Sequence, residues 1–225
     1  MTYTCAEIYD TLADDYDTHF QDDVSLAENE AIFQWLRPKS NGTICDMGCG
    51  TGLLLEYLNI PPEQYVGVDV SQEMLNHARN KFPQHNFIHA DIQGSVPLHD
   101  HQFNTILMLF GTLSYCNAPY AVVDEIERLL QPGGIFFVML CADAYQKRPT
   151  HIINNCKQDD IYFQTYNYEE TSKMFQRFGD VEIFGFSPVD LNGTDDITSD
   201  IMVKSITTDT IEMQDRYFLV VTGHA

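Results

Sequence analysis

The apolar positions of this chain fall into short runs that are separated by stretches of helical periodicity. The runs are rich in Val, Ile, Leu and Phe and are bounded by Gly, Pro or acidic residues, as is typical of strands buried in a sheet. They lie at residues 43–46, 65–69, 86–91, 103–110, 135–141, 181–186 and 217–222. Strands that alternate with helices predict an α/β fold.

Apolar residues at intervals of three and four predict helices between these runs, at about 3–20, 25–35, 53–58, 72–81, 120–130 and 168–178. Ser71 is the expected N-cap of the fourth helix, with Glu73 in its first turn. Glu28 and Glu30 are expected on the solvated face of the second helix. A chain of 225 residues is long enough for these elements to form one α/β domain with a full core.

Composition narrows the classes of function. The chain is 44% hydrophobic and 12% aromatic, so it is not a disordered protein. Its 33 acidic and 12 basic residues give a formal net charge of −21, which disfavours a nucleic-acid substrate and an anionic membrane surface. Two explanations of the acidity stay open: solubility, for example in a salt-tolerant host, and a preference for cationic substrates.

Six scattered cysteines and a polar N-terminus favour a cytoplasmic protein. No signal peptide opens the chain, and no segment reaches the roughly 20 apolar residues of a membrane span. Cys45 and Cys49 lack metal-site spacing, and no metal is expected. We expect no membrane or nucleic-acid partner, and a monomer or a homodimer.

The most informative stretch is a glycine-rich turn after the first apolar run. Asp46 ends the run, Gly48, Gly50 and Gly52 follow at alternate positions, and the helix at 53–58 comes next. Glycines let the backbone approach a ligand, and a helix N-terminus favours an anionic or nucleotide-like group. The turn lacks the Lys-Ser/Thr end of a P-loop and misses the dinucleotide pattern G-x-G-x-x-G by one residue.

Two further acidic residues end the second and third runs. Asp69 lies 19 residues after Gly50, the distance at which an acid can accept hydrogen bonds from ribose hydroxyls. Asp91 closes the third run, and a Leu-x-Pro-Gly-Gly turn at 130–134 precedes the fifth. These spacings favour a nucleotide-like ligand at the carboxyl ends of the strands.

Over residues 40–141 these motifs resemble the class I S-adenosylmethionine (SAM)-dependent methyltransferases of small molecules, whose turn reads acid-x-Gly-x-Gly-x-Gly. The resemblance implies SAM as cofactor and a three-layer Rossmann-like α/β sandwich. Its sheet would have seven strands, mostly parallel, with an antiparallel last strand and helices on both faces. Residues 1–40 would form an N-terminal helical lid and 41–225 the SAM-binding domain, with substrate-facing insertions at about 142–167 and 187–215.

The resemblance also implies roles in the cofactor site. The glycine turn would hold the methionine end of SAM, and Asp46 would orient the turn or receive the methionine ammonium through water. Asp69 would bind the ribose, and Asp91 with Ile92 the adenine. Met74 would flank the adenine or pack in the core. The expected cofactor-binding residues are Tyr9, Tyr16, Asp46, Gly48, Cys49, Gly50, Gly52, Asp69, Val70, Met74, Asp91, Ile92, Leu109 and Phe110.

The pattern Tyr-Asp-x-x-Ala-x-x-Tyr-Asp at residues 9–17 resembles the N-terminal lid of many small-molecule methyltransferases. In that family the second tyrosine, here Tyr16, reaches over the methionine end of SAM. Ile8, Leu12 and Tyr16 also form a helical stripe, with Tyr9 beside it. Packing on the core is therefore the alternative role of both tyrosines.

Methyl transfer is an in-line displacement, and it needs a general base only if the acceptor is protonated at neutral pH. The candidate catalytic residues are Tyr16, Tyr115 and His151, with Tyr145 as a further candidate. The leading expectation is transfer to an O, N or S atom of a small metabolite. The alternatives are intramolecular cyclisation of SAM with release of methylthioadenosine, a protein methyltransferase, and a SAM-binding protein without catalysis.

Overall fold

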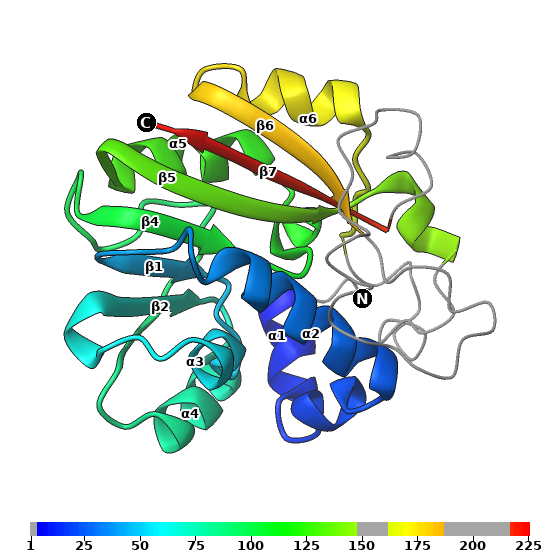
Figure 1. Cartoon of the computed structure of the whole chain (residues 1–225). Coiled ribbons are helices and arrows are strands. Elements are labelled where there is room, and N and C mark those ends of the chain that lie inside the picture. The colour runs from blue at the N-terminus through cyan, green and yellow to red at the C-terminus, as the bar shows by residue number, and fades with distance from the viewer. Residues whose placement is uncertain (1–3, 148–161, 187–216) are drawn as a thin grey trace.

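The structure is a computed structural model that describes residues 4–147, 162–186 and 217–225 (Figure 1). Its α-helices are α1 (Cys5–Leu12), α2 (Asp23–Leu36), α3 (Leu53–Tyr57), α4 (Gln72–Lys81), α5 (Pro119–Leu129) and α6 (Tyr168–Phe175). Its 3-10 helices are η1 (Tyr16–Phe20), η2 (Pro62–Gln64), η3 (Thr112–Tyr115) and η4 (Asp143–Lys147). Its strands are β1 (Ile44–Met47), β2 (Tyr65–Asp69), β3 (Asn86–His89), β4 (Phe103–Met108), β5 (Leu130–Cys141), β6 (Gly179–Phe186) and β7 (Phe218–His224). Residues 148–161 of the first expected insertion, which include His151, and the whole insertion expected at 187–215 lie outside the described residues.

The strands form a seven-stranded sheet in the order β3-β2-β1-β4-β5-β7-β6. Strands β1 to β5 pair in parallel, and β7 runs antiparallel to both β5 and β6. The expected sheet with its antiparallel last strand is confirmed. Because the carboxyl ends of parallel strands lie at one edge of a sheet, the turns that follow β1, β2, β3 and β4 meet there.

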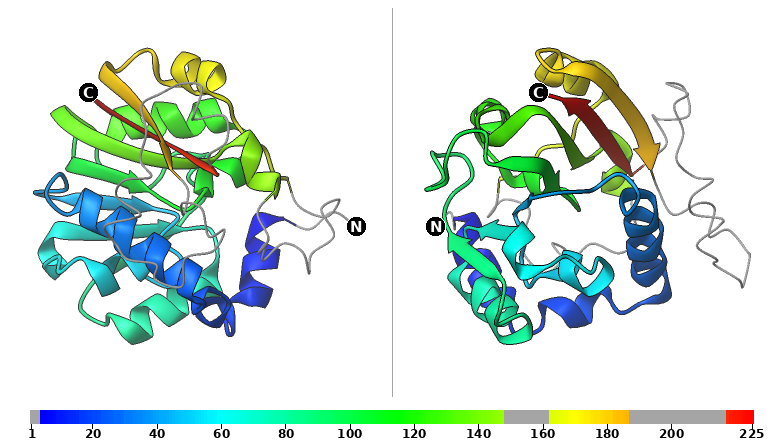
Figure 2. Two further views of the ribbon diagram at one scale, coloured as in Figure 1. Left: turned by 45° about the vertical axis from the view of Figure 1, so that its right-hand side comes forward. Right: turned by 60° about the vertical axis from the view of Figure 1, so that its left-hand side comes forward.

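Two helical layers cover the sheet, which confirms the three-layer sandwich (Figure 2). Side chains alternate along each strand, so Phe136 and Val138 share a core with α5 and α6, whereas Phe137 and Met139 share one with α2, α3 and α4. The described helices α1 and η1 contribute to neither core. Among all described helices, none has the length and apolar character that a membrane crossing needs.

The N-terminal segment is not the continuous helix that its stripe predicted. α1 ends at Leu12, and Tyr16 begins η1 instead of the next turn of α1. Asp14 and Asp15 stand between them, and aspartate has low helix propensity. The chain tightens there into hydrogen bonds between residues three apart, as from the Asp15 N–H to the Leu12 carbonyl.

Glu28 was predicted to face solvent, and that prediction is wrong. Its side chain is buried, with 4% of its surface exposed. Glu28 lies three residues after Ser25 and four before Ile32, which are both buried, so it belongs to the stripe of α2 that packs inward. Glu30, on the other side of the helix, is exposed as expected.

Several strand boundaries differ from the sequence prediction, among them β5, which begins at Leu130 and includes the predicted Pro-Gly-Gly turn, and three strand ends near the carboxyl edge of the sheet. Pairing of β1 with β2 continues one residue beyond Asp46, so this acid lies inside the strand. β3 stops at His89, opposite the last residue of β2, and Asp91 follows in a turn. β4 ends at Met108, and Phe110 lies beyond it in a turn with a φ of 52°. Asp91 and Phe110 therefore lie on short turns at the sheet edge, whereas Asp46 lies one residue before the end of β1.

Candidate cofactor site

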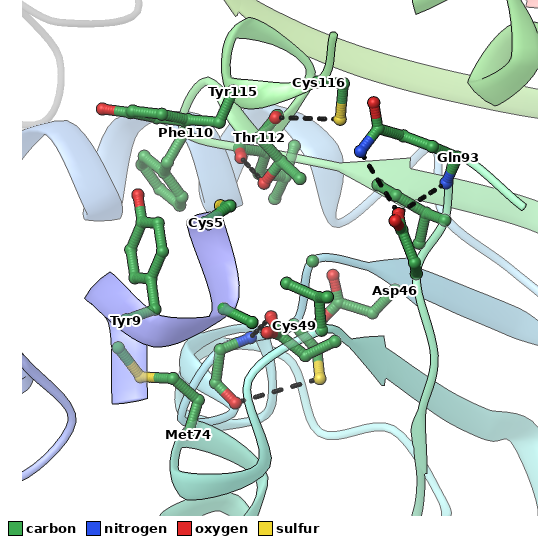
Figure 3. A pocket seen from close by; sticks show the side chains of 18 of the residues that line it. Cys5, Tyr9, Asp46, Cys49, Met74, Gln93, Phe110, Thr112, Tyr115 and Cys116 are labelled. Atoms are coloured by element: carbon green, nitrogen blue, oxygen red, sulfur yellow. Dashed lines mark hydrogen bonds between the residues drawn. The ribbon is translucent and has the colours of Figure 1, made fainter. Parts of the chain in front are cut away.

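A cavity of about 660 Å³ opens where the parallel strands end (Figure 3). Its wall combines α1, the glycine turn after β1, the residues at the ends of β2, β3 and β4, and η3. The predicted site residues that line it are Tyr9, Tyr16, Asp46, Gly48, Cys49, Gly50, Asp69, Val70, Met74, Asp91, Ile92, Leu109, Phe110 and Tyr115. The fold thus brings together residues that lie far apart in the first half of the chain.

The glycine turn is held against β2 by backbone hydrogen bonds. The N–H groups of Gly48 and Cys49 donate to the carbonyl oxygen of Val68, at 2.7 and 3.1 Å. Gly50 has a φ of 53°, and a Cβ atom at this position would meet no other atom within 4 Å. Since Gly50 lines the cavity, a ligand has room to approach its backbone.

Gly52 is the one residue predicted to bind the cofactor that does not line the cavity. It is the N-cap of α3, and a Cβ atom there would lie 3.0 Å from the ring of Phe82 at the end of α4. Gly52 therefore permits close packing of α3 against Phe82, and it contributes to the site through the position of the turn.

Asp69 connects the glycine turn with the start of α4. Its Oδ2 accepts the Gly50 N–H at 2.9 Å, and its Oδ1 accepts the Ser71 N–H at 2.8 Å. Burial raises the pKa of this carboxyl in spite of both hydrogen bonds. A carboxylate can accept about four hydrogen bonds in all, so the group retains capacity for a hydroxyl group of a ligand.

Asp46 is the most deeply buried acid of the cavity wall. Its Oδ2 accepts the Tyr65 hydroxyl at 2.9 Å. Burial raises the pKa of Asp46 to about 7, the Tyr65 hydrogen bond opposes the rise, and the nearby charge of Asp69 adds to it. A cation placed beside Asp46 would lower that pKa and favour the ionised carboxylate.

Asp91, Ile92 and Met74 contribute another part of the wall. The Asp91 carboxylate accepts the Gln93 N–H at 2.9 Å, which fixes the turn after β3. Asp91 is exposed, whereas Ile92 is buried. Met74 is buried in α4, as its predicted core role requires, and it also lines the cavity.

Three tyrosines form an aromatic wall over the cavity. The ring centroids of Tyr9 and Tyr16 are 6.0 Å apart, and those of Tyr9 and Tyr115 are 5.9 Å apart with the rings at 88°. Phe20 packs on Tyr16 and Phe163 packs on Tyr115. Figure 3 shows Tyr9 and Tyr115 on one side of the cavity, with Asp46 on another.

Burial raises the pKa of Tyr9, Tyr16 and Tyr115 well above the usual value for a phenol. Their hydroxyl groups are therefore neutral at physiological pH and can donate hydrogen bonds, while a general base would need a lower pKa. Tyr145, a further candidate base, does not line the cavity and packs on Phe218, with ring centroids 5.1 Å apart.

Sequence reasoning missed several residues of the wall. Cys5 lies one helical turn before Tyr9, so the periodicity of α1 was a signal that could have located it. Thr112 and Cys116 lie in or just after η3, which no periodicity marks. Burial raises the pKa of the Cys5 and Cys116 thiols to about 12, so both are neutral contacts. The other missed residues include Ala6, Gln93, Asn117 and Tyr162.

The chemistry of the wall fits SAM. Three carboxylates line the cavity, from Asp46, Asp69 and Asp91, and none of the described lining residues is Lys, Arg or His. Such a wall favours a cation that also carries hydrogen-bond donors, as SAM does with its sulfonium, ammonium, hydroxyl and amino groups. Within the described ranges, no group of three or more His, Cys, Asp or Glu side chains is arranged to hold a metal ion.

Known proteins with similar sequences include methyltransferases and an uncharacterized protein. Residues 45–138 match the protein family described as "Methyltransferase domain". A demethylmenaquinone methyltransferase of Chlamydia pneumoniae is 30% identical over 154 residues, which cover 65% of each chain. An uncharacterized protein of Methanocaldococcus jannaschii is 33% identical over 141 residues, which cover 62% of this chain and 52% of that protein. The chain thus spans between half and two thirds of the length of these relatives.

Solved structures share the fold. A SAM-dependent methyltransferase of Thermotoga maritima, described as a possible histamine N-methyltransferase, aligns with a TM-score of 0.73 at 19% identity. The alignment covers 97% of this chain and 98% of that one. Residues 45–138, which include the glycine turn, Asp69 and Asp91, thus match a methyltransferase domain, and the chain shares the fold of a SAM-dependent methyltransferase.

Proposed function

We propose that this chain is a SAM-dependent methyltransferase that transfers a methyl group to a small molecule. The observation that carries the proposal is the cavity, where three carboxylates and an open glycine turn face a wall of tyrosines. Two similar proteins are named for demethylmenaquinone and for histamine, which are small molecules. We therefore propose a small molecule as the methyl acceptor of this protein.

SAM bound in this cavity would supply an activated methyl group on its sulfonium. Asp69 would accept hydrogen bonds from its ribose hydroxyls, and Asp91 with Ile92 would hold its adenine. The turn at Gly48 and Gly50 would hold the methionine end. Asp46 would balance the ammonium charge, since its pKa near neutrality falls when a cation binds beside it.

The aromatic wall would exclude water and orient the acceptor. Tyr9, Tyr16 and Tyr115 present ring faces and neutral hydroxyls, and ring faces stabilise a neighbouring cation. An acceptor that enters unprotonated would need orientation only. His151 remains the candidate base for a protonated acceptor.

We also propose a cytoplasmic location. The described cysteines, Cys5, Cys45, Cys49, Cys116 and Cys141, are all free thiols. Free thiols suit a reducing compartment.

The test is mass spectrometry of the purified protein incubated with SAM alone and then with a metabolite extract. S-adenosylhomocysteine that appears only with extract, together with an extract component heavier by one methylene unit, would support methyl transfer and name the acceptor. Methylthioadenosine from SAM alone would replace the proposal with intramolecular cyclisation. Methylation of an added protein would replace the proposal of a small-molecule acceptor with that of a protein methyltransferase.

Asp69→Ala should lose most of the affinity for SAM. The substitution removes the acceptors of two backbone N–H groups and the proposed ribose contact, so we expect a loss of about a hundredfold or more, as for a charged hydrogen-bond partner. Isothermal titration calorimetry measures the affinity, with Glu30→Ala on the exposed side of α2 as the control. Unchanged affinity would refute the ribose contact.

A further inference from the structure

The N-terminal segment contains two Tyr-Asp pairs, Tyr9-Asp10 and Tyr16-Asp17, whose members do different things. Both tyrosines line the cavity. Both aspartates instead bind residues of the SAM-binding domain, beside the two turns that meet at Asp69. The segment is therefore attached at the places where the cofactor is expected to bind.

Asp10 holds α1 to the start of α4. Its Oδ1 accepts the Ser71 hydroxyl at 2.6 Å and the Glu73 N–H at 3.1 Å. Ser71 is completely buried, and its own N–H donates to Asp69 at 2.8 Å. One residue, Ser71, thus separates the Asp10 carboxylate from the carboxylate that would bind the ribose.

Asp17 holds η1 to the glycine turn. Its Oδ1 accepts the Thr51 hydroxyl at 2.6 Å, and its Oδ2 accepts Lys81 Nζ at 2.9 Å. Burial alone would raise the pKa of Asp17, but these hydrogen bonds outweigh it and hold the pKa below its usual value. Thr51 follows Gly50, whose N–H donates to Asp69. The second attachment therefore also leads back to Asp69.

Apolar packing contributes little to the docking of α1. Ile8 is the residue of this helix that is buried, and neither α1 nor η1 contributes to the two cores of the sheet. α1 lies against α4, and the hydrogen bonds of Asp10 join the two helices. The hydrogen bonds of Asp10 and Asp17 thus help to position the tyrosine wall, together with its own ring contacts.

We propose that Asp10 and Asp17 are positioning residues that couple the docking of the α1–η1 segment to occupation of the cofactor cavity. The proposal rests on the proposed function, since it takes SAM as the occupant. A ligand that orders Asp69 and its two turns also orders Ser71 and Thr51, on which the segment docks. Coupling between two equilibria is reciprocal. If the ligand strengthens docking of the segment by some factor, loss of docking must lower the affinity for the ligand by the same factor.

Asp14 offers a matched control on the same segment. Its carboxylate pairs with His77 Nε2 at 3.1 Å, so it also joins the segment to α4. Its side chain is 95% exposed, and His77 donates to neither cofactor turn. Asp14→Ala therefore removes a comparable contact without touching the pathway to Asp69.

The experiment compares the full chain with Asp10→Ala, Asp17→Ala, Asp10→Asn and Asp14→Ala. Calorimetry gives the affinity of each for S-adenosylhomocysteine, and hydrogen exchange gives the protection of residues 5–20 with and without it. We expect Asp10→Ala and Asp17→Ala each to lose about tenfold in affinity and most of the ligand-induced protection. Asp10→Asn, which keeps an acceptor oxygen for Ser71, should recover most of both, and Asp14→Ala should match the wild type.

Three results would overturn the proposal in distinguishable ways. If the alanine variants expose residues 5–20 but bind with wild-type affinity, the attachments are structural only. If Asp14→Ala loses as much affinity as Asp10→Ala, any contact that docks the segment supports ligand binding. The inference that the coupling acts through Asp69 would then be wrong. If the wild-type chain does not bind S-adenosylhomocysteine, the proposed function fails first. A wild-type chain that binds it but transfers no methyl group would remove the proposed activity and leave the coupling intact.

Discussion

Gly50 and Gly133 share a left-handed backbone conformation but have different surroundings. Both adopt a positive φ, of 53° and 78°, and a Cβ atom at either position would meet no atom within 4 Å. Gly50 lines the cavity, whereas Gly133 lies in β5 away from it. The pair therefore separates the cost of backbone strain from the cost of filling the ligand's space.

Gly50→Ala and Gly133→Ala should each lose about 1 kcal/mol of unfolding free energy, because alanine is strained at positive φ. Only Gly50→Ala should lose affinity for S-adenosylhomocysteine, by at least about tenfold, since its methyl group would stand where the ligand approaches the backbone. Urea unfolding and calorimetry on both variants give the two quantities. Equal affinity in both variants would mean that the ligand does not approach this turn.

Asp46 should make stability fall as pH rises. Its pKa is about 7 in the fold and about 3.9 in an unfolded chain, so between those values the folded state holds a proton that the unfolded state lacks. Stability then decreases with rising pH over that window and is constant above it. Relative to Asp46→Asn, the ligand-free wild type should lose roughly 2 kcal/mol between pH 5.5 and pH 8.

Urea unfolding of both proteins at the two pH values measures this difference. Asp100→Asn is the control, because Arg128 holds the pKa of the exposed Asp100 below its usual value and the group stays ionised throughout this range. A difference between wild type and Asp46→Asn that does not change with pH would show that Asp46 is already ionised in the fold.

At the scale of elements, η1 decides where Tyr16 lies. The break after Leu12 removes Tyr16 from the stripe of α1 and turns it toward the cavity, where it packs between Tyr9 and Phe20. Its ring contacts account for packing, and its neutral hydroxyl can donate a hydrogen bond to a ligand. The predicted lid role would therefore belong to the hydroxyl group, and the packing role belongs to the ring.

Tyr16→Phe keeps the ring and removes the hydroxyl, so it tests the lid role alone. We expect turnover of the acceptor found by mass spectrometry to fall by about tenfold, with the melting temperature unchanged. Tyr120→Phe, at an exposed position on α5, is the control for loss of a phenol. A Tyr16→Phe enzyme as fast as the wild type would leave Tyr16 with a packing role only.

At the scale of the whole molecule, charge is the dominant feature. A formal net charge of −21 makes the compact state repel itself. Added salt shortens the range of this repulsion, from about 10 Å at 0.1 M to about 3 Å at 1 M. Exposed ion pairs, such as Arg177 with Asp124, weaken over the same range but contribute little to begin with.

Stability should therefore rise with sodium chloride. We expect the melting temperature to increase by several degrees between 0.1 and 1 M, as the repulsion is screened. Chloride is preferred to sulfate for this measurement because sulfate strengthens apolar burial by itself. A melting temperature that is flat or falls with salt would favour the other explanation of the acidity, a preference for cationic substrates.

The sequence by itself determined the order of strands and helices along the chain, the glycine turn, and the positions of Asp46, Asp69 and Asp91 after or at the end of apolar runs. These features are local, because alternation, helical spacing and turn residues act over a few positions. The carboxyl ends of parallel strands lie at the same edge of the sheet, independently of which side chains form the core. Most of the expected cofactor residues line the cavity for this reason.

Only the tertiary structure decided which residues pack in the interior of the protein and which line the cavity. Glu28 is buried because α2 turns it toward the core, and Gly52 faces Phe82 instead of the cavity. Contacts such as Asp10 with Ser71 and Asp17 with Thr51 join residues 61 and 34 positions apart. No periodicity reports on such pairs, because the distance between two side chains from separate elements is set by how those elements pack.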